Sequence, residues 1–574
     1  MILQALKQYY DRKVADPEAG MAPMGWEPKE IPFMLILDPS GKPVSLNDTR
    51  EGTGRDRRAR KHLVPQAVIR TSGKIAANLL WDNPAYMFGI TAEGANERTA
   101  QLHAAFCGRV ESLDAADDPG LSAVKAFLRR DDKAALLSEF GEPWKDLLET
   151  GANATFQLVG ETKPVLSGAL FKRAYDAELA AAPNGAKCLC LVSGEQDVIA
   201  RLHAPIKGVR DAQSSGARIV AFNCEAFNSL GKEQGANAPI GQAAAFAYTT
   251  ALNHLLGRDS RQKLQVGDAT TVFWSEKPSL LEAQFSDFFG EPPKDDPDRG
   301  TRAVESLLRA PQTGVLVPGE AGTRFYVLGL APNASRIAVR FWVAATIADM
   351  CANIRQHFLD LAITHGPRDM DALSIFRMLT SIAPLGKAEN IPPNIAGATM
   401  RCILAGLPYP KTLLDAAIRR NRAEQTVTYA RAALLKACIN RMVRFQSPHH
   451  KEELAVSLDT SNDNAGYRLG RLFATLEKIQ MEASPGINAT IRDRYYGAAS
   501  GVPVTVFGNL MRLKNHHLAK LDSAGRRVNF EKLLAEIMGG VADFPAHLSM
   551  VDQGRFAIGY YHQMQDFFTR KKEA

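Results

Sequence analysis

The chain has 574 residues, of which 45% are hydrophobic and 23% are charged. This composition is that of a globular protein and disfavours a disordered, collagen-like or coiled-coil chain. At about 150 residues per domain, the length predicts three to four domains or two large ones. The net charge of +7, from 69 Lys and Arg against 62 Asp and Glu, permits a nucleic-acid partner without requiring one.

The first half of the chain alternates short apolar runs with turn residues, a pattern typical of a mixed α/β domain. The run from Ile31 to Leu37 is followed by Asp38-Pro39-Ser40-Gly41 and then Pro43-Val44, which predicts a hairpin. Ile337, Val339, Phe341 and Val343 alternate with other residues, as in a strand with one buried face. Further short strands are expected over residues 187–192, 217–222 and 270–274.

After about residue 345 the pattern changes to helices separated by Pro and Gly. Helices are expected over residues 344–361, 370–382, 412–438, 464–480 and 507–521, with Ser461 and Asn462 as candidate N-caps. The sequence therefore predicts an α+β chain. A large mixed α/β domain would span residues 1–345 and an all-α region residues 346–574, with a looser boundary near 440–460.

The cysteines and the apolar runs indicate in which cellular compartment the protein is expected. The seven cysteines are scattered, and Cys188 and Cys190 would point to opposite faces of a strand, which makes a poor chelate. Free thiols in a reducing cytoplasm are therefore expected. The N-terminus turns polar within seven residues and no run of about 18 apolar residues occurs, so neither a signal peptide nor a membrane span is predicted.

Familiar enzyme signatures are absent from the sequence. It contains no G-x-x-x-x-G-K-[ST], no G-x-G-x-x-G after a strand, no G-x-S-x-G and no H-E-x-x-H. His449-His450 and His516-His517 are adjacent pairs and cannot form an i,i+4 metal face on a helix. No catalytic residue, metal or cofactor is predicted, although a missing motif does not exclude catalysis.

A basic stretch near the N-terminus is the first candidate binding segment. Residues 55–62 carry five Arg or Lys and one Asp, a local charge of +4. Guanidinium groups bind phosphate bidentately and release counterions on binding. Phosphate binding is therefore expected here, and a solvated loop is the alternative. The residues are Arg55, Arg57, Arg58, Arg60 and Lys61.

The second segment, residues 70–83, combines a glycine with small polar and amide side chains. Gly73 lets the backbone approach a ligand, Arg70, Ser72 and Lys74 can contact phosphate, and Asn78 or Asn83 could read base edges. A turn with an Asn cap is the alternative reading of the same residues.

The third segment is a glycine-containing loop over residues 229–239, after the strand expected at 217–222. Two glycines bracket Lys232, Glu233 and Gln234, and Asn237 follows, as suits an exposed loop that approaches a ligand through its backbone. Upstream, Lys207 and Arg210 add a basic loop, and phosphate binding is expected of both residues. A structural Ω-loop is the alternative.

The C-terminal helices offer a fourth surface. Residues 482–574 contain twelve Lys or Arg and nine Asp or Glu. A basic helical face can follow a single strand through its phosphates, although most such faces are merely solvated. The candidate residues are Arg492, Arg494, Arg512, Lys514, Lys520, Arg526 and Arg527.

Short sequence pieces occur in a fixed order along the whole chain. The most specific are Phe222-Asn223, Gly231-Lys232-Glu233-Gln234-Gly235 and Asn237-Ala238-Pro239. The others run from end to end of the chain: Met1 to Leu6 with Tyr9-Tyr10, Pro32-Phe33, Asp48-Thr49-Arg50, Arg70 to Gly73, Asp82-Asn83, Ile206 to Val209, Ser215 to Ala217, Tyr248 to Asn253, Pro392 to Asn394, Tyr467 to Gly470 and Gly559 to Tyr561. In this order the pieces make the chain resemble the large subunit of the type I-C CRISPR Cascade effector.

The resemblance implies a non-catalytic role in RNA-guided antiviral defence. Such a subunit recognises the protospacer-adjacent motif in duplex DNA, promotes unwinding, stabilises the R-loop and recruits a helicase-nuclease. The implied partners are CRISPR RNA, target DNA, and the backbone and handle-binding subunits, with no membrane. The C-terminal part, about residues 442–574, would resemble the Cascade small subunit and could also be made separately, with Met442 as one candidate start.

Two other classes of function stay open from the residues alone. A stand-alone metal-dependent nucleic-acid enzyme could use scattered carboxylates, although no two-metal spacing is recognisable. A pure assembly scaffold would not contact DNA, and it has no evident use for the polar loops over residues 72–78 and 232–237.

Overall fold

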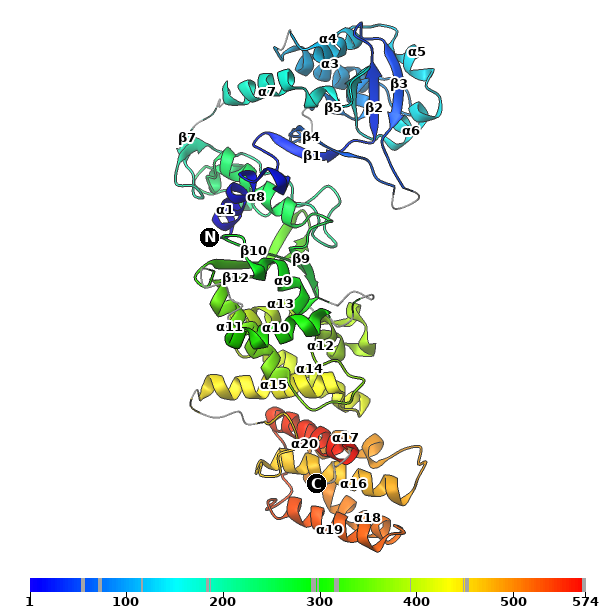
Figure 1. Ribbon diagram of the computed structural model, residues 1–574, viewed down its shortest axis with the longest axis vertical. Helices are drawn as coiled ribbons and strands as arrows, with labels where there is room; N and C mark the ends of the chain where they lie inside the picture. The colour runs from blue at the N-terminus through cyan, green and yellow to red at the C-terminus, as the bar shows by residue number, and fades with distance from the viewer. Residues whose placement is uncertain are drawn as a thin grey trace. The chain divides into compact units, whose positions relative to one another are not determined.

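The computed structural model describes residues 1–52, 57–70, 75–114, 117–181, 185, 187–290, 296, 299–313, 320–392, 394–447, 449 and 454–569 (Figure 1). The chain divides into two compact units. The first unit comprises Met1–Ile206 and Arg218–His254, and the second comprises Lys207–Ala217 and Leu255–Ala574.

A four-stranded sheet forms the centre of the first unit. Its order is β3-β2-β6-β5, with β2 (Phe33–Leu37) antiparallel to β3 (Pro43–Asp48) and parallel to β6 (Ala154–Leu158). The short β5 (Trp81–Asp82) pairs with β6. Every residue of β2 is buried because all five are apolar. The predicted hairpin is confirmed.

Helices pack around this sheet and bury its aromatic side chains. Phe106, Phe127 and Phe156 lie at the centre of the core, each fully buried. Gly41, at φ +80°, turns the β2–β3 hairpin so close to the backbone of Phe127 that a Cβ would overlap it. The helices are α2 (Pro84–Met87), α3 (Glu97–Glu111), α4 (Pro119–Leu128), α5 (Lys133–Ser138) and α6 (Glu142–Thr150).

A two-stranded ribbon and a pair of helices complete the first unit. The ribbon pairs β1 (Trp26–Glu30) with β4 (Lys61–Pro65), and Trp26 donates to Asp176 on α7 (Ala169–Ala181) at 3.0 Å. Tyr10 of α1 (Ile2–Val14) meets Phe246 of α8 (Gln242–Leu255) edge-on, with ring centroids 5.8 Å apart.

Two of the expected strands in the first unit differ from the structure. The strand expected over 187–192 is shorter, β7 (Lys187–Leu189), and it pairs with β8 (Gln196–Val198). The strand expected over 217–222 is wrong, since this segment forms only isolated bridges at Ala217 and Arg218. The Arg218 side chain donates to the His203 carbonyl at 2.9 Å, and an apolar run forms a strand only where a partner strand pairs with it.

The second unit begins with an antiparallel sheet of order β12-β11-β10-β9. Its strands are β9 (Lys263–Val266), β10 (Ala269–Ser275), β11 (Arg324–Asn333) and β12 (Arg336–Thr346). These strands confirm the predictions at 270–274 and 337–343. Val339 is the exception to the expected buried face, at 42% exposed. The register shifts between Gly329 and Leu330, and such a bulge interrupts the alternation of faces.

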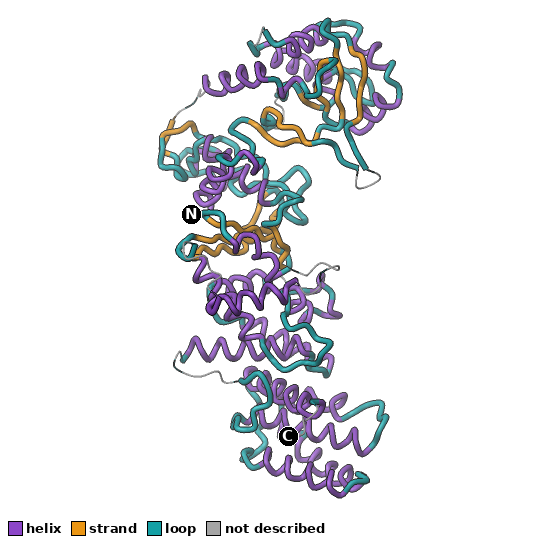
Figure 2. Tube along the Cα trace, viewed as in Figure 1, coloured by secondary structure: helices purple, strands orange, loops and turns teal. Residues whose placement is uncertain are grey.

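In the chain, helices α9 (Leu280–Phe289) and α10 (Arg299–Thr313) follow β10 and precede β11. From α11 onward the described chain consists of helices and loops (Figure 2). The next helices are α11 (Ile347–Leu361), α12 (Ile375–Ile382), α13 (Ile395–Leu404), α14 (Lys411–Glu424) and α15 (Tyr429–Gln446). The single helix expected over 412–438 is therefore wrong. Gln425 at φ +54° ends α14, and the Thr428 side chain caps α15.

The C-terminal bundle contains α16 (Ala465–Ala483), α17 (Ile491–Gly501), α18 (Phe507–Ala519), α19 (Ala524–Met538) and α20 (Met550–Phe568). Asn464, and neither Ser461 nor Asn462, caps α16 by accepting from the Tyr467 amide at 3.2 Å. Helices α16 and α20 pack closely at Gly470. A Cβ at this position would overlap the Phe556 carbonyl, so the approach requires a glycine. The predicted class, a mixed α+β N-terminal region and a helical C-terminal region, is confirmed.

Candidate nucleic-acid interface

Carboxylates from other strands face the arginines of the basic stretch at residues 57–61. Arg57 pairs with Asp48 of β3, Arg60 lies 3.1 Å from Glu51, and Arg58 lies 4.0 Å from Glu30 of β1. The Arg58 backbone also exchanges two hydrogen bonds with Glu51, of 2.7 and 2.8 Å. The local charge that the sequence suggests is therefore largely compensated in the fold.

These ion pairs remain open to competition from a phosphate. The Arg60 and Glu51 side chains are 71% and 74% exposed, and pairs of this kind contribute about 0–1 kcal/mol. Lys61 begins β4, while Arg55 lies outside the described residues. Phosphate binding by this stretch stays a prediction.

The second candidate segment is closed at its base by a buried carboxylate. Asp82, 1% exposed, accepts hydrogen bonds from the Arg70 side chain and, at 3.0 Å, from the Asn78 amide. Arg70 also donates to the Ala76 carbonyl at 2.9 Å, and its guanidinium lies 3.9 Å from the centre of the Tyr86 ring. One arginine thus ties both sides of the segment to the sheet.

Asn78 and Asn83 make structural contacts. The buried Asn78 side chain accepts from the Val68 amide at 3.0 Å. Asn83 caps α2 by accepting from the Tyr86 amide at 3.3 Å, which is the alternative that the sequence left open. Ser72, Gly73 and Lys74 lie outside the described residues. Base reading by this segment stays a prediction.

The loop over Ser229–Asn237 is braced from within by one amide side chain. Asn237 accepts from the Ser229 amide at 2.9 Å and donates to the carbonyls of Lys232 and Gln234 at 3.1 and 3.0 Å. A Cβ on Gly235 would overlap the Ala200 carbonyl, so only glycine fits there. The loop has a fixed shape without any ligand.

This braced loop presents a cation to solvent. Lys232 is exposed and has no carboxylate partner within the described part of the chain. Gln234 is half-buried, and its side-chain oxygen accepts from Arg201 at 2.5 Å. Of the three residues predicted from this loop, Asn237 and Gln234 shape it, and Lys232 is available to a ligand.

Lys207 and Arg210 lie in the second unit, on a backbone that is held against β10. The Arg210 amide donates to the Thr270 hydroxyl at 3.0 Å. A Cβ on Gly208 would overlap the Leu256 carbonyl, so the backbone passes close to Leu256. The Arg210 side chain is 64% exposed and lies 3.6 Å from Asp211. This loop and the Ser229–Asn237 loop therefore belong to different units.

The seven predicted cations of the C-terminal bundle separate into two groups. Arg526 forms two hydrogen bonds with Glu482, of 2.8 and 2.6 Å, and Arg492 lies 3.8 Å from the buried Glu477. Five have no carboxylate partner among the described residues, and all but the half-buried Lys514 are exposed. They are Arg494, Arg512, Lys514, Lys520 and Arg527.

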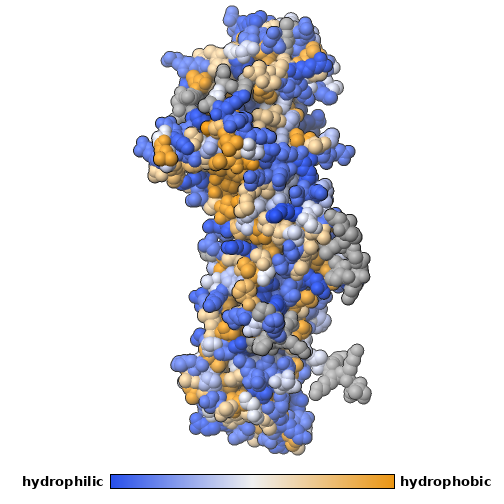
Figure 3. All heavy atoms as spheres, turned by 90° about the vertical axis from the view of Figure 1, so that its left-hand side faces the viewer, coloured by the Kyte–Doolittle hydropathy of each residue, from blue (hydrophilic) through white to orange (hydrophobic). Residues whose placement is uncertain are grey.

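The bundle end of the molecule is mostly hydrophilic on the face that Figure 3 shows. The five cations come from α17, α18, the residue after α18, and α19. Among the described residues, no group of three or more His, Cys, Asp or Glu side chains could hold a metal ion. No described helix is long and apolar enough to span a membrane.

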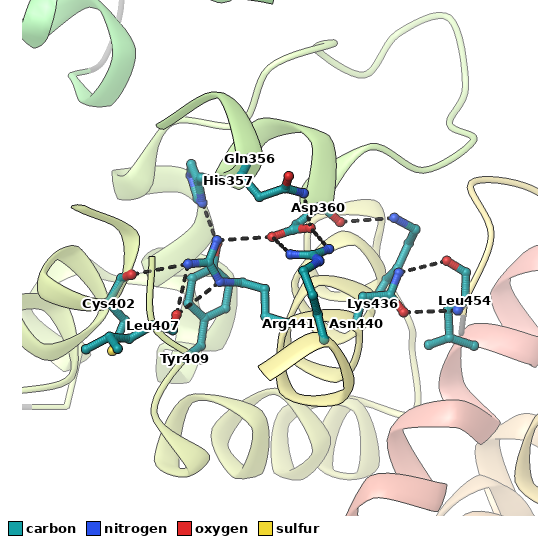
Figure 4. A network of polar contacts seen from close by, with 11 residues as sticks. Gln356, His357, Asp360, Cys402, Leu407, Tyr409, Lys436, Asn440, Arg441 and Leu454 are labelled. Atoms are coloured by element: carbon teal, nitrogen blue, oxygen red, sulfur yellow. Dashed lines mark hydrogen bonds and ion pairs between the residues drawn. The ribbon is translucent and has the colours of Figure 1, made fainter. Parts of the chain in front are cut away.

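A buried polar network in the second unit was not predicted from the sequence (Figure 4). Asp360 of α11, fully buried, pairs with Arg441 at 3.0 Å and with Arg444 at 2.6 Å. The Asn440 side chain exchanges two hydrogen bonds with the Leu454 backbone, of 2.8 and 3.0 Å. These contacts join α15 to α11 and to the segment that precedes the C-terminal bundle.

The sequence does contain an indication of this network. Charged residues occur among the apolar residues of α15, and a charge that becomes buried needs a partner. Lys436 of α15 is fully buried and donates to the Asp360 carbonyl at 3.1 Å. Burial lowers the pKa of His357, which hydrogen-bonds Tyr409, to about 3, so this imidazole stays neutral. The network therefore ties α15 to α11 and to the Leu454 backbone.

The comparison with protein families assigns the chain to a class. The fold is a mixed α+β region followed by a helical bundle, and a family model described as a CRISPR-associated protein matches residues 6–568. The chain belongs to that family, Cas_Csd1, which is the large subunit of the type I-C Cascade. No curated protein matches the chain.

Proposed function

We propose that this chain recognises the protospacer-adjacent motif in duplex DNA, promotes unwinding and stabilises the R-loop. The observation that carries the proposal is the Ser229–Asn237 loop. It has a fixed shape, and it holds the unpaired Lys232 in solvent. A preformed loop loses little conformational entropy on binding, which favours recognition. Members of the family are generally non-catalytic, and a binding role fits that property.

Modest contacts are enough for this role. Replacing a DNA duplex by an RNA–DNA heteroduplex is nearly balanced in free energy. One good base contact discriminates by about 1–3 kcal/mol, so a few contacts from one loop can license unwinding. The five unpaired cations of the C-terminal bundle would then hold a separated strand through its phosphates.

The family implies Cascade partners in general, and the proposal names them. CRISPR RNA, the backbone subunits and the handle-binding subunit would assemble with this chain. A small subunit made from about residues 442–574 would join them. A helicase-nuclease would dock after the DNA is opened and supply the cleavage that this chain does not perform.

The test is a duplex-binding titration of the reconstituted RNA-guided complex with and without this chain. The two targets differ only in the base pairs that flank the protospacer. The proposal expects a flank preference that appears only with the chain present. The same affinity and preference without the chain would contradict the proposal and favour the assembly scaffold.

Variants of the loop sharpen this titration. Lys232→Ala should reduce affinity for the preferred flank, by about tenfold if the lysine contacts a base and less if it contacts only phosphate. Lys163→Ala is the matched control, because Lys163 is another exposed lysine of the first unit. Equal losses in both variants would show a general charge effect and remove the loop from the proposal. Magnesium-dependent DNA cleavage by the chain alone would favour the enzyme reading.

A further inference from the structure

Strand β12 forms one edge of the sheet in the second unit, and this edge has little protection against pairing with another strand. The strand is 11 residues long, and residues 341–345 contain no charged residue, proline or glycine. An exposed edge of this kind can pair with a further strand, so proteins normally keep edge strands short or place Lys or Pro on them. Ala344 is exposed and Trp342 is half-buried, so a partner can reach the segment.

The other edges of the two four-stranded sheets are protected in the usual ways. β9 has four residues and begins with Lys263. β3 begins with Pro43 and ends with Asp48, whose carboxylate pairs with Arg50 at 2.8 Å. β5 has two residues. Fold requirements therefore do not account for the long uncharged edge of β12.

The hydrogen-bond pattern of the sheet shows which backbone groups face this edge. The Ile347 amide donates to the Thr323 carbonyl at 2.9 Å, so the odd-numbered residues from 341 onward point their N–H and C=O groups toward β11. The even-numbered residues Trp342 and Ala344 therefore point theirs away from the sheet. These outward groups form no hydrogen bond with any other part of the described chain.

An aromatic surface lies beside the outward backbone groups. The Trp342 ring stacks on Tyr326 of β11, with ring centroids 5.5 Å apart and 10° between the ring planes. Trp274 of β10 continues the row, with its ring 5.7 Å from that of Trp342. Directly opposed side chains of neighbouring strands lie about 5 Å apart, so an added strand would place a side chain against Trp342. Backbone bonds at the edge can thus give affinity, and the indole can select an apolar or aromatic side chain.

We propose that the open edge of β12 at Trp342 and Ala344 binds an extended segment of another protein subunit as a further strand of the sheet. The site requires a backbone in the β conformation with an apolar or aromatic side chain opposite Trp342. Each of the two residues would donate one hydrogen bond and accept one. The inference rests on the proposed function in one respect, namely that the partner is a subunit of the RNA-guided complex.

The edge fits a different protein better than it fits nucleic acid or a second copy of this chain. Phosphate groups only accept hydrogen bonds, so a nucleic-acid backbone would leave the outward carbonyls of Trp342 and Ala344 without donors. β12 carries Arg336 and Arg340 and no carboxylate of its own. Two copies paired along this edge would bring only positive charges together, whereas a partner strand with Asp or Glu would complement them.

Hydrogen exchange at single amides tests the proposal in the full chain. The four samples are the chain alone, the chain with guide RNA, the reconstituted complex, and the complex with target duplex. In the chain alone, the Trp342 and Ala344 amides should exchange faster than the Val343 and Ala345 amides, which bond β11. In the complex, before any duplex is added, exchange at Trp342 and Ala344 should slow by about tenfold or more.

Three results of this experiment would overturn the proposal. Both amides could exchange in the complex as fast as in the chain alone, which would leave the edge open. Slowing by guide RNA without the other subunits would identify nucleic acid as the occupant. Slowing in the chain alone that increases with its concentration would identify a second copy.

Two substitutions at position 344 separate the backbone contact from the side chain. Ala344→Pro deletes one outward N–H and blocks an approaching strand, and it spares the bonds to β11 because that N–H points away from the sheet. Ala344→Ser keeps the N–H and is the matched control. We expect Ala344→Pro to bind the other subunits about tenfold more weakly and to unfold at the same denaturant concentration as the natural chain. Ala344→Ser should match the natural chain in both measurements.

Natural binding by a folded Ala344→Pro chain, or equal weakening by Ala344→Ser, would contradict strand docking. If Ala344→Pro does not fold, the exchange rates of the natural chain decide alone. Flank preference separates this proposal from the proposed function. If the edge stays open in a complex whose flank preference requires this chain, strand docking fails and the proposed function stands. If both amides slow in a complex without flank preference, strand docking stands and the proposed function fails.

Discussion

Two basic regions of the sequence differ in the charge that they offer to a ligand. The arginines at residues 57–60 meet Glu30, Asp48 and Glu51, which neighbouring strands and the hairpin bring to them. Among the described residues, no carboxylate pairs with Arg494, Arg512 or Arg527 of the bundle helices α17–α19. A cluster of basic residues in sequence therefore predicts charge, and only the fold decides whether that charge is available.

The largest expected effect comes from disrupting the bundle without changing any cation. Gly470→Ala would place a Cβ against the Phe556 carbonyl between α16 and α20 and should lower the free energy of unfolding by about 3 kcal/mol. The measurement is denaturant unfolding, together with single-strand binding of the complex, which should weaken.

Gly497→Ala on α17 is the matched control, because nothing lies within 4 Å of a Cβ there. It should raise stability by about 0.5–1 kcal/mol. Equal stability of the Gly470→Ala chain and the natural chain would show that the close approach of α16 and α20 is not required.

Removing the unpaired cations tests the bundle side of the comparison directly. Replacing Arg494, Arg512, Lys520 and Arg527 together by Ala should reduce the salt slope of single-strand binding by about 3, since each phosphate contact contributes about 0.7. Replacing Arg57, Arg58 and Arg60 should reduce the slope much less, because carboxylates already compensate them. A larger change from the second set would reverse the comparison.

Removing the carboxylates that pair with the arginines at residues 57–60 should make these arginines available to DNA phosphates. Glu30→Gln with Glu51→Gln releases Arg58 and Arg60, and nonspecific duplex affinity should rise about threefold to tenfold at low salt. Glu93→Gln with Glu161→Gln, at two other exposed carboxylates of the first unit, is the control for the same change in net charge. An equal rise in the control would show that compensation is not the cause.

The smallest effect concerns pH. The hydrogen bond from Arg50 lowers the pKa of Asp48 from its ordinary 3.8, so its pairs stabilise the fold above that pH and weaken as the pH falls through the lower folded-state value. Asp48→Asn should therefore cost about 1 kcal/mol of unfolding free energy at pH 7 and at pH 5. The cost should shrink below pH 3.8, measured by denaturant unfolding at each pH. A cost that already disappears at pH 5 would contradict the lowered pKa.

Local patterns predicted the parts of the fold that depend on neighbouring residues. The run from Ile31 to Leu37 and its Gly41 turn became β2 and the hairpin, and the helical spacing near residues 464–480 became α16. Local reasoning failed at 217–222, where a strand-like run lacks a ladder, and at Gln425, which divides one expected helix into two. The spacing of apolar residues shows neither whether a partner strand will pair with a run nor whether one residue will adopt the left-handed backbone.

The sequence by itself determined the class of fold and the family, and it selected the loops that are proposed to bind DNA, because these depend on composition, periodicity and the order of short motifs. Only the tertiary structure decided which of those side chains are available. Asn78 and Asn237 hold loops together, Arg57 is paired, and Lys232 remains exposed. The reason is that hydrogen bonds and ion pairs join residues through space, and their partners lie on other turns and strands of the chain.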